Sequence, residues 1–204
     1  AGFIEKVVSR HDKRNVTLHI TEKGNKEIKN CKDDMKIFTT RLFEGINKED
    51  LDRINKVYIV ACGTAYHAGL CGASILERAT RLPVLTQVAS EFRYNDPIID
   101  EKTLCIFVSQ SGETADTLAA LKLANEKGCT TIAVTNVLGS TISREAQHTL
   151  YTCAGPEIAV ASTKAYTTQL VLLTLIALYI ADKRGDTVDT DLMEQLNNLP
   201  EYVS

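Results

Sequence analysis

The chain contains 204 residues, of which 24% are charged, and its net charge at pH 7 is -3. A chain of this length can bury a substantial core as one domain with appendages, but it leaves little room for two full domains. The nearly balanced charge argues against a nucleic-acid-binding surface and against a polybasic membrane-binding surface. We therefore expect neither nucleic acid nor membrane as a partner.

The first 48 residues are the least regular part of the chain, and we expect an N-terminal arm or helical lead-in there. They contain an extended-looking segment at 16–20 and a helical pattern from about 26 to 43. Residues 1–14 are mixed and charged, without the long apolar run of a secretory signal. The predicted location is therefore the cytoplasm.

From residue 56 onward, short apolar runs alternate with helical patterns. Strands are predicted at 57–62, 84–88, 104–108, 131–135 and 149–153, and helices at 65–80, 113–127, 140–147 and 165–181. Short apolar strands that are separated by helices are typical of a parallel sheet covered on both faces. We predict an α/β fold, a three-layer αβα sandwich with a five-stranded parallel sheet of the flavodoxin-like type.

The segment 165–181 is uncharged and strongly apolar. It is shorter than the roughly 20 residues that span a bilayer, and its Thr and Gln residues weaken the case for a membrane span further. We expect a core helix, part of which a partner can cover. A last helix is predicted from about 191 to 200. The predicted domain limits are 1–48 for the arm, 49–184 for the α/β domain and 185–204 for a C-terminal helix or linker.

Cysteine spacing and nucleotide-binding patterns both argue against bound cofactors. No C-x-x-C pair occurs among the six cysteines, which are Cys31, Cys62, Cys71, Cys105, Cys129 and Cys153. This makes zinc sites and redox frameworks unexpected, and the cysteines are predicted to be reduced core residues. Neither G-x-x-x-x-G-K-[ST] nor a G-x-G-x-x-G after a strand is present, so we expect no nucleotide cofactor and no metal.

The segment Ser109-Gln110-Ser111-Gly112-Glu113-Thr114 carries the strongest functional signal. It lies between the predicted buried strand at 104–108 and a helical pattern that stops at Gly128. At a helix N-terminus, unpaired N–H groups and the positive end of the macrodipole favour an anion. Three hydroxyl groups add donors, and the glycine allows close approach of the backbone. This pattern predicts a phosphate site. In the purely structural alternative, Ser111 or Thr114 only caps the helix.

Three turns are predicted at the carboxyl ends of strands, at 63–64, 109–114 and 161–164. In parallel sheets, ligands bind beyond those ends, near the place where the strand order reverses.

Several stretches resemble the sugar isomerase (SIS) domain: ACGTAYHAG at 61–69, ASEFRY at 89–94, SQSGETADT at 109–117 and GPEIAVASTKAYTTQ at 155–169. Within that superfamily they resemble the glutamine:fructose-6-phosphate amidotransferases, also called glucosamine-6-phosphate synthases. The resemblance covers about residues 50–182 and implies the SIS fold.

The resemblance implies part of an enzyme that makes glucosamine 6-phosphate from fructose 6-phosphate and ammonia released from glutamine. It implies that the sugar phosphate is held by Ser109, Gln110, Ser111 and Thr114, in a pocket also lined by Thr64, Val160 and Ser162. It further implies a homodimer, a second SIS domain and a glutaminase domain as partners. The segment that usually links the glutaminase domain to the isomerase half is not recognisable before Glu49.

No catalytic residue is assigned to this chain. In the resembled family, the imine-forming lysine and the glutamate and histidine that move protons belong to the second SIS domain and the C-terminal tail. For Lys164, a helix-end or phosphate-facing role is favoured over a nucleophile. His67 could donate to a ligand, but a single histidine on an apolar-rich helix is more often structural. Ala65 stands where many relatives have serine, so any bond from that hydroxyl is lost.

Two alternatives belong to other functional classes. One is a phosphosugar sensor without catalysis, although residues 1–55 show neither a helix-turn-helix pattern nor a basic recognition helix. The other is a stand-alone phosphosugar isomerase, which would turn over a ketose phosphate without glutamine.

Overall fold

The computed structural model describes residues 4–8, 16–22, 43, 45, 46, 48–156, 163–186, 191, 192, 195, 196 and 198. The chain forms two compact units, Ala1–Glu44 and Gly45–Ser204. In the first unit, β1 (Ile4–Val8) pairs antiparallel with β2 (Val16–Ile20), which confirms the extended segment predicted there. The helix predicted over 26–43 lies almost entirely outside the described residues, as does much of the helix predicted over 191–200. The predicted domain limits stay a prediction.

The second unit is built on one parallel sheet of five strands, ordered β4-β3-β5-β6-β7. Its strands are β3 (Lys56–Ala61), β4 (Val84–Val88), β5 (Thr103–Val108), β6 (Thr130–Thr135) and β7 (His148–Tyr151). All six residues of the central strand β5 are buried. A strand buried along its whole length needs cover on both faces, and helices supply it. The predicted three-layer α/β fold is confirmed.

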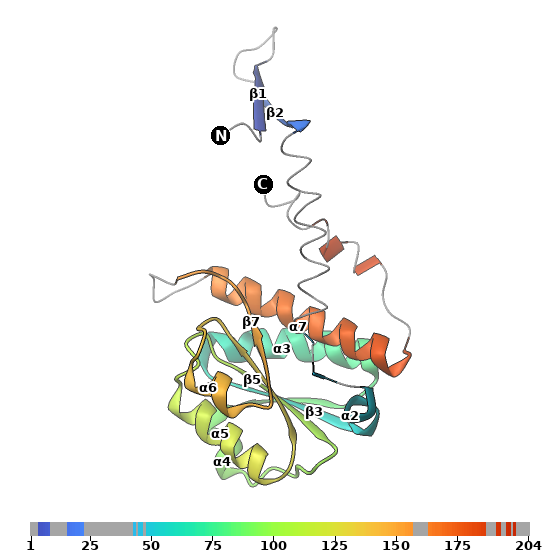
Figure 1. Cartoon of the computed structure of the whole chain (residues 1–204), viewed down its shortest axis with the longest axis vertical. Helices are drawn as coiled ribbons and strands as arrows, with labels where there is room; N and C mark the ends of the chain where they lie inside the picture. Colours follow the sequence, from blue (N-terminus) through green and yellow to red (C-terminus); the bar gives the residue numbers. More distant parts are fainter. Residues whose placement is uncertain are drawn as a thin grey trace. The chain divides into compact units, whose positions relative to one another are not determined.

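One face of the sheet is covered by α3 (Gly63–Thr80) and α7 (Thr163–Arg184) (Figure 1). Two glycines of α3 allow this close packing. A Cβ atom on Gly69 would lie 2.9 Å from Cγ2 of Ile59 on β3, and one on Gly72 would lie 2.8 Å from Cδ1 of Leu173 on α7. Because real Cβ atoms do not approach so closely, larger residues at these two positions would push the helix away from the sheet and from α7.

By length and composition alone, α7 is apolar enough to cross a membrane. However, 56% of the residues in its 18-residue apolar window are buried inside the protein. Leu173, Ile176 and Ala177 are completely buried, as expected for a helix that is apolar on nearly every side. The predicted core helix is confirmed.

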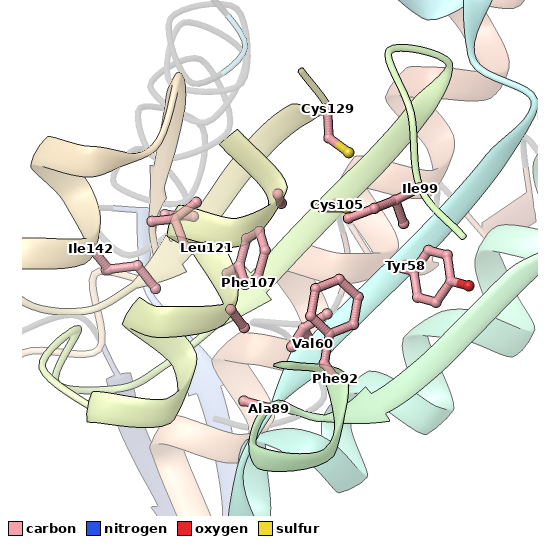
Figure 2. Packing of buried hydrophobic residues seen from close by; sticks show 13 residues of the cluster. Tyr58, Val60, Ala89, Phe92, Ile99, Cys105, Phe107, Leu121, Cys129 and Ile142 are labelled. Atoms are coloured by element: carbon pink, nitrogen blue, oxygen red, sulfur yellow. The ribbon is translucent and has the colours of Figure 1, made fainter. Parts of the chain in front are cut away.

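The opposite face carries α4 (Ala89–Tyr94), α5 (Ala115–Glu126) and α6 (Thr141–Glu145). Their shared core is centred on aromatic rings (Figure 2). The ring of Phe92 lies edge-on to Tyr58 and Phe107, with centroids 5.5 and 6.4 Å apart. Burying a phenylalanine stabilises a fold by about 1.5–3 kcal/mol, and an edge-to-face pair adds about 0.5–1.5 kcal/mol.

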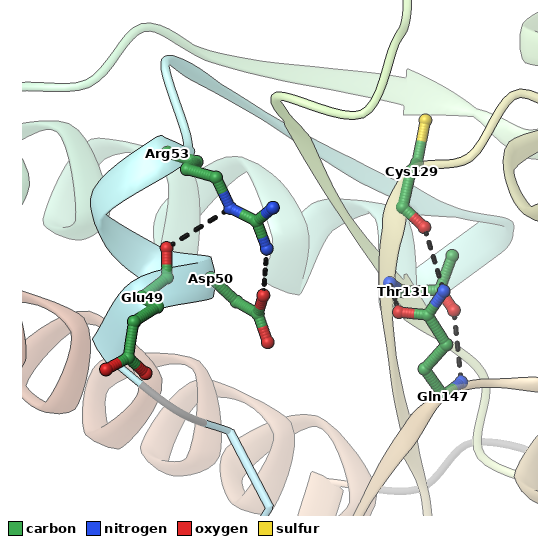
Figure 3. A network of polar contacts seen from close by, with 6 residues as sticks. All are labelled: Glu49, Asp50, Arg53, Cys129, Thr131 and Gln147. Atoms are coloured by element: carbon green, nitrogen blue, oxygen red, sulfur yellow. Dashed lines mark hydrogen bonds and ion pairs between the residues drawn. The ribbon is translucent and has the colours of Figure 1, made fainter.

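A polar network joins the beginning of β6 to the turn before β7 (Figure 3). The side chain of Gln147 donates to the carbonyl of Cys129 at 3.2 Å and accepts from the backbone N–H of Thr131 at 3.4 Å. The Thr131 hydroxyl accepts from the backbone N–H of Gln147 at 3.1 Å and donates to Asn125 at 2.9 Å. This network secures the amino end of the sheet.

Two short helices and several element ends differ from prediction. Helices α4 and α2 (Lys48–Arg53) were not predicted, and in α2 Arg53 pairs with Asp50 (Figure 3). The helix predicted at 113–127 begins only at Ala115. The strand predicted at 149–153 ends at Tyr151, because Cys153 has a φ of 52° and leaves the extended conformation.

The expectation that all cysteines are core residues is wrong for two of them. Cys105 and Cys129 are buried, but Cys71 and Cys153 are exposed, and Cys62 is half-buried. Cys71 lies on α3 with its Sγ 3.8 Å from the hydroxyl of Tyr166 on α7, and Cys153 lies in the loop after β7. These five cysteines are free thiols.

Candidate functional site

The strand order reverses beside β3. From β3 the chain passes to β4 on one side and then crosses to β5 on the other, so β3 and β5 are neighbours although β4 lies between them in the sequence. Their last residues, Ala61 and Val108, are register partners. The turns at 63–64 and 109–114 therefore start side by side at the topological switch point, where open α/β sheets bind ligands.

The loop Ser109–Thr114, here called the hydroxyl loop, is closed by its own hydroxyl groups. Ser109 Oγ accepts from the backbone N–H of Gly112 at 3.1 Å and lies 3.0 Å from Thr114 Oγ1. Ser111 Oγ accepts from the N–H of Glu113 at 3.2 Å. Ser109 is buried, Thr114 half-buried and Ser111 exposed. The three hydroxyls thus line one tight turn and differ in access to solvent.

The hydroxyl loop leads directly into α5. Thr114 is the residue before the helix, yet its side chain makes no capping hydrogen bond and pairs with Ser109 instead. The N–H of Leu118 makes the first helical bond, to the carbonyl of Thr114 at 3.0 Å. The N–H groups of residues 115–117, in the first turn of α5, therefore have no acceptor within the helix, as the anion interpretation requires. The alternative in which Thr114 merely caps the helix is not supported.

Gly112 is the tightest point of the loop. Its φ is 68°, and a Cβ atom there would lie 2.6 Å from Cβ of Ser140 and 2.8 Å from Cγ2 of Ile142. Its carbonyl accepts from the N–H of Ile142 at 3.0 Å. Both the left-handed backbone and the close approach to α6 require glycine here.

The acidic residue of the loop is turned toward α6. Glu113 Oε1 accepts from the backbone N–H of Thr141 at 2.7 Å. This bond from Thr141, together with the smaller influence of Arg144, lowers the pKa of the Glu113 carboxyl. A carboxylate would repel a bound anion, and the bond to α6 gives it another partner.

Gln110 has an unusual side chain. Its backbone carbonyl accepts from the N–H of Asn136 at 3.1 Å and from the hydroxyl of Thr135 at 3.4 Å. Its amide Nε2 and Oε1 are both buried, and neither has a hydrogen-bond partner in the described part of the chain. A buried, unpaired amide is rare and costs about 1–3 kcal/mol per group, so this one needs an explanation.

The other predicted residues are placed as follows. Thr64 is exposed in the first turn of α3, next to Ala65, and Gly63 before it has a φ of 57°. Val160 and Ser162 lie outside the described residues. His67 is exposed, with its ring edge-on to that of Tyr66. That contact is within the helix and assigns His67 no ligand.

Lys164 lies at the beginning of α7, and its ammonium group donates to the carbonyl of Pro156 at 2.5 Å. This bond agrees with the helix-end role that the sequence analysis favoured over a nucleophile. Within the described ranges, no group of three or more His, Cys, Asp or Glu residues could hold a metal ion.

Asn136 was not among the predicted site residues. This residue follows β6 at the same edge of the sheet and bonds the hydroxyl loop through its backbone. The signal that could have found it was a polar residue immediately after a buried strand, in the position that Ser109 occupies after β5.

Comparison with known proteins identifies the fold. The pattern of the SIS domain matches residues 50–179, which include the whole sheet and the hydroxyl loop. The chain belongs to the SIS domain family. Thr64 and the four predicted residues of the hydroxyl loop all lie within the matched part of this SIS domain.

Two curated relatives of this SIS domain carry the same name. It is 62% identical over 151 residues to glutamine–fructose-6-phosphate aminotransferase [isomerizing] of Clostridium tetani, covering 74% of this chain and 25% of that protein. It is 60% identical over 161 residues to the protein of the same name in Caldanaerobacter subterraneus subsp. tengcongensis, covering 78% and 26%. The chain therefore spans about a quarter of the length of these curated relatives.

Solved structures agree with the fold. The C-terminal domain of glucosamine-fructose-6-phosphate aminotransferase from Francisella tularensis matches the SIS domain with a TM-score of 0.70 and 37% identity, over 76% of this chain and 43% of that chain. A glucosamine-6-phosphate deaminase from Thermotoga maritima matches with a TM-score of 0.62 and 25% identity, over 87% and 53%.

Proposed function

We propose that this SIS domain binds the phosphate group of fructose 6-phosphate or glucosamine 6-phosphate in the hydroxyl loop. The observation that carries the proposal is the arrangement of Ser109, Ser111 and Thr114 at the N-terminus of α5, at the topological switch point. The buried, unpaired amide of Gln110 supports it, because a polar ligand bound at this edge of the sheet would supply the missing hydrogen-bond partners.

The phosphate would be held without a Lys or Arg in the loop. Helix N–H groups carry a partial positive charge, and neutral hydroxyls can donate to phosphate oxygens. Ser109 would act mainly by shaping the loop, since its hydroxyl already bonds Gly112 and Thr114. Ser111 is exposed and can rotate toward a ligand. Thr64, Val160 and Ser162 would complete the pocket around the sugar.

We further propose that the domain serves an enzyme that makes glucosamine 6-phosphate from fructose 6-phosphate and glutamine-derived ammonia. The names of its relatives support this assignment. This chain would fix the phosphate, while the reacting carbons project toward catalytic groups of a second SIS domain. Binding energy at the phosphate, remote from the reacting carbons, then positions the substrate. A glutaminase domain, a homodimer and a cytoplasmic location belong to the same proposal.

The test is a calorimetric titration of the purified chain with fructose 6-phosphate and with fructose. We expect binding of the phosphorylated sugar only. Ser111→Ala should weaken that binding by about 1–3 kcal/mol, the usual contribution of a hydrogen bond to a charged group. The matched control is Ser74→Ala, which removes an exposed hydroxyl on α3 and should leave affinity unchanged.

Equal affinity of the Ser111→Ala and wild-type chains would remove Ser111 from the site, and equal binding of fructose would overturn the phosphate assignment. Turnover of a ketose phosphate by this chain without glutamine would favour the stand-alone isomerase instead. Binding by the complete gene product without any turnover would favour the sensor.

A further inference from the structure

Asn136 is the point at which two segments near the switch point are joined. It follows β6 and is half-buried. Its backbone N–H donates to the carbonyl of Gln110 in the hydroxyl loop at 3.1 Å. Its side chain is directed to another part of the chain, the segment Thr152–Gly155 that follows β7.

The side chain of Asn136 makes three bonds to that segment. Its Oδ1 accepts from the backbone N–H of Ala154 at 2.8 Å and from the hydroxyl of Thr152 at 3.1 Å. Its Nδ2 donates to the carbonyl of Gly155 at 2.8 Å. Both ends of the amide are therefore used, and one planar group sets the shape of four consecutive residues.

The segment needs such support, because its backbone is unusual. Cys153 has a φ of 52° and Gly155 a φ of 70°, so two of its residues are left-handed, and one of them is not glycine. A left-handed conformation costs about 1–2 kcal/mol for a residue with a side chain and persists only where surrounding contacts hold it. The side chain of Asn136 bonds the residue before Cys153, Thr152, and the two residues after it, Ala154 and Gly155.

We propose that Asn136 is a positioning residue that sets the placement of the segment Thr152–Gly155 relative to the hydroxyl loop. This inference rests on the proposed function, in which the hydroxyl loop holds the phosphate and the sugar lies at the same edge of the sheet, where Thr152–Gly155 follows β7. The two halves of the bridge are chemically separate. Any substitution except proline keeps the backbone bond to Gln110. The side chain of Asn136, by contrast, bonds Thr152, Ala154 and Gly155, and apart from it the N–H of Thr152 donates to the carbonyl of Thr135 at 2.9 Å. Losing the side chain should therefore affect recognition of the sugar and spare recognition of the phosphate.

The chain contains a matched control in Asn125. This asparagine is also half-buried, accepts from a threonine hydroxyl at 2.9 Å and donates to a backbone carbonyl, that of Glu145, at 2.9 Å. It belongs to the network at the amino end of the sheet, away from the strand ends that bear the loop. Asn125→Ala and Asn136→Ala each remove a half-buried side-chain amide that accepts from a threonine hydroxyl and donates to a backbone carbonyl.

The experiment measures the affinities of fructose 6-phosphate and of inorganic phosphate for wild type, Asn136→Ala and Asn125→Ala by following the amide resonance of Gly112. For Asn136→Ala we expect the ratio of fructose 6-phosphate affinity to inorganic phosphate affinity to fall about tenfold, while the affinity for inorganic phosphate itself changes by less than about threefold. For Asn125→Ala the ratio should stay at the wild-type value. Amide hydrogen exchange at Ala154 should accelerate in Asn136→Ala only.

Thr152→Val provides a milder second variant, because it removes one bond to Asn136 and leaves the asparagine in place. It should lower the ratio in the same direction by a smaller factor. Equal losses for both ligands, or an unchanged ratio in both variants, would overturn the role of Asn136. If the wild-type chain binds inorganic phosphate and not fructose 6-phosphate, or neither of them, the proposed function itself fails and the role of Asn136 fails with it.

Discussion

The carboxylate of Glu113 accepts a 2.7 Å hydrogen bond from the backbone N–H of Thr141, a residue 28 positions further along the chain. The neighbouring residues are joined in the same way, since the carbonyl of Gly112 accepts from the N–H of Ile142 at 3.0 Å. Two successive residues of the hydroxyl loop are thus held by two successive residues of α6. The shape of the proposed phosphate site depends on this short helix as well as on α5.

Replacing Glu113 tests that connection. Glu113→Ala should weaken fructose 6-phosphate binding about fivefold, similar to the loss of one helix cap. Glu113→Gln keeps an acceptor for Thr141 and should bind within about twofold of wild type. Removing a negative charge near an anion would by itself strengthen binding. Weaker binding by Glu113→Ala would therefore be due to the lost bond from Thr141. Calorimetric titration measures both variants.

Glu126→Ala is the control, because it removes the same charge from an exposed position at the end of α5. Tighter binding by Glu113→Ala than by wild type would mean that the charge matters more than the connection to α6.

Substitution of Gly112 should be much more damaging than substitution of a glycine with the same backbone conformation. Gly112→Ala combines a left-handed φ with a collision against Ser140, and should lower the free energy of unfolding by about 2–4 kcal/mol. Gly128 has a φ of 76°, and a Cβ atom added there would meet no atom within 4 Å, so Gly128→Ala should lower it by only about 1–2 kcal/mol. Urea denaturation compares the two variants, and equal losses would show that packing against α6 is unimportant.

His148 should make stability depend on pH. It is half-buried on the edge strand β7, and burial lowers its pKa below the ordinary value of 6.5, with a smaller opposing influence from Asp50. Between pH 6.5 and the lowered folded pKa, the unfolded chain binds more protons than the folded chain. The free energy of unfolding should therefore fall as the pH decreases through this window and stop falling from this cause below the folded pKa.

Urea denaturation between about pH 7.5 and pH 5.5, the range in which histidine changes charge, measures this slope. His148→Gln should flatten it, whereas His67→Gln, at an exposed position on α3, should retain the part that His148 contributes. A slope that survives intact in His148→Gln would assign the pH dependence to other groups.

Much of the fold could be predicted because its signals are local. The apolar runs of β3, β5 and β6 are buried along nearly their whole length, and such runs are visible without any tertiary information. Helices α2 and α4 were not predicted, because they have six residues each and are too short to show a clear period.

The candidate site likewise combines features that follow from chain order with contacts that only the folded structure creates. The sequence by itself determined that hydroxyl groups and a glycine stand between a buried strand and a helix, since chain order alone places them there. Only the tertiary structure decided that Ser109 and Thr114 pair with each other, that Glu113 is bonded to α6 and that Asn136 holds Thr152–Gly155. The last two bonds join residues that are distant in the sequence, and such contacts exist only after the parallel strands have brought their carboxyl ends to one edge of the sheet.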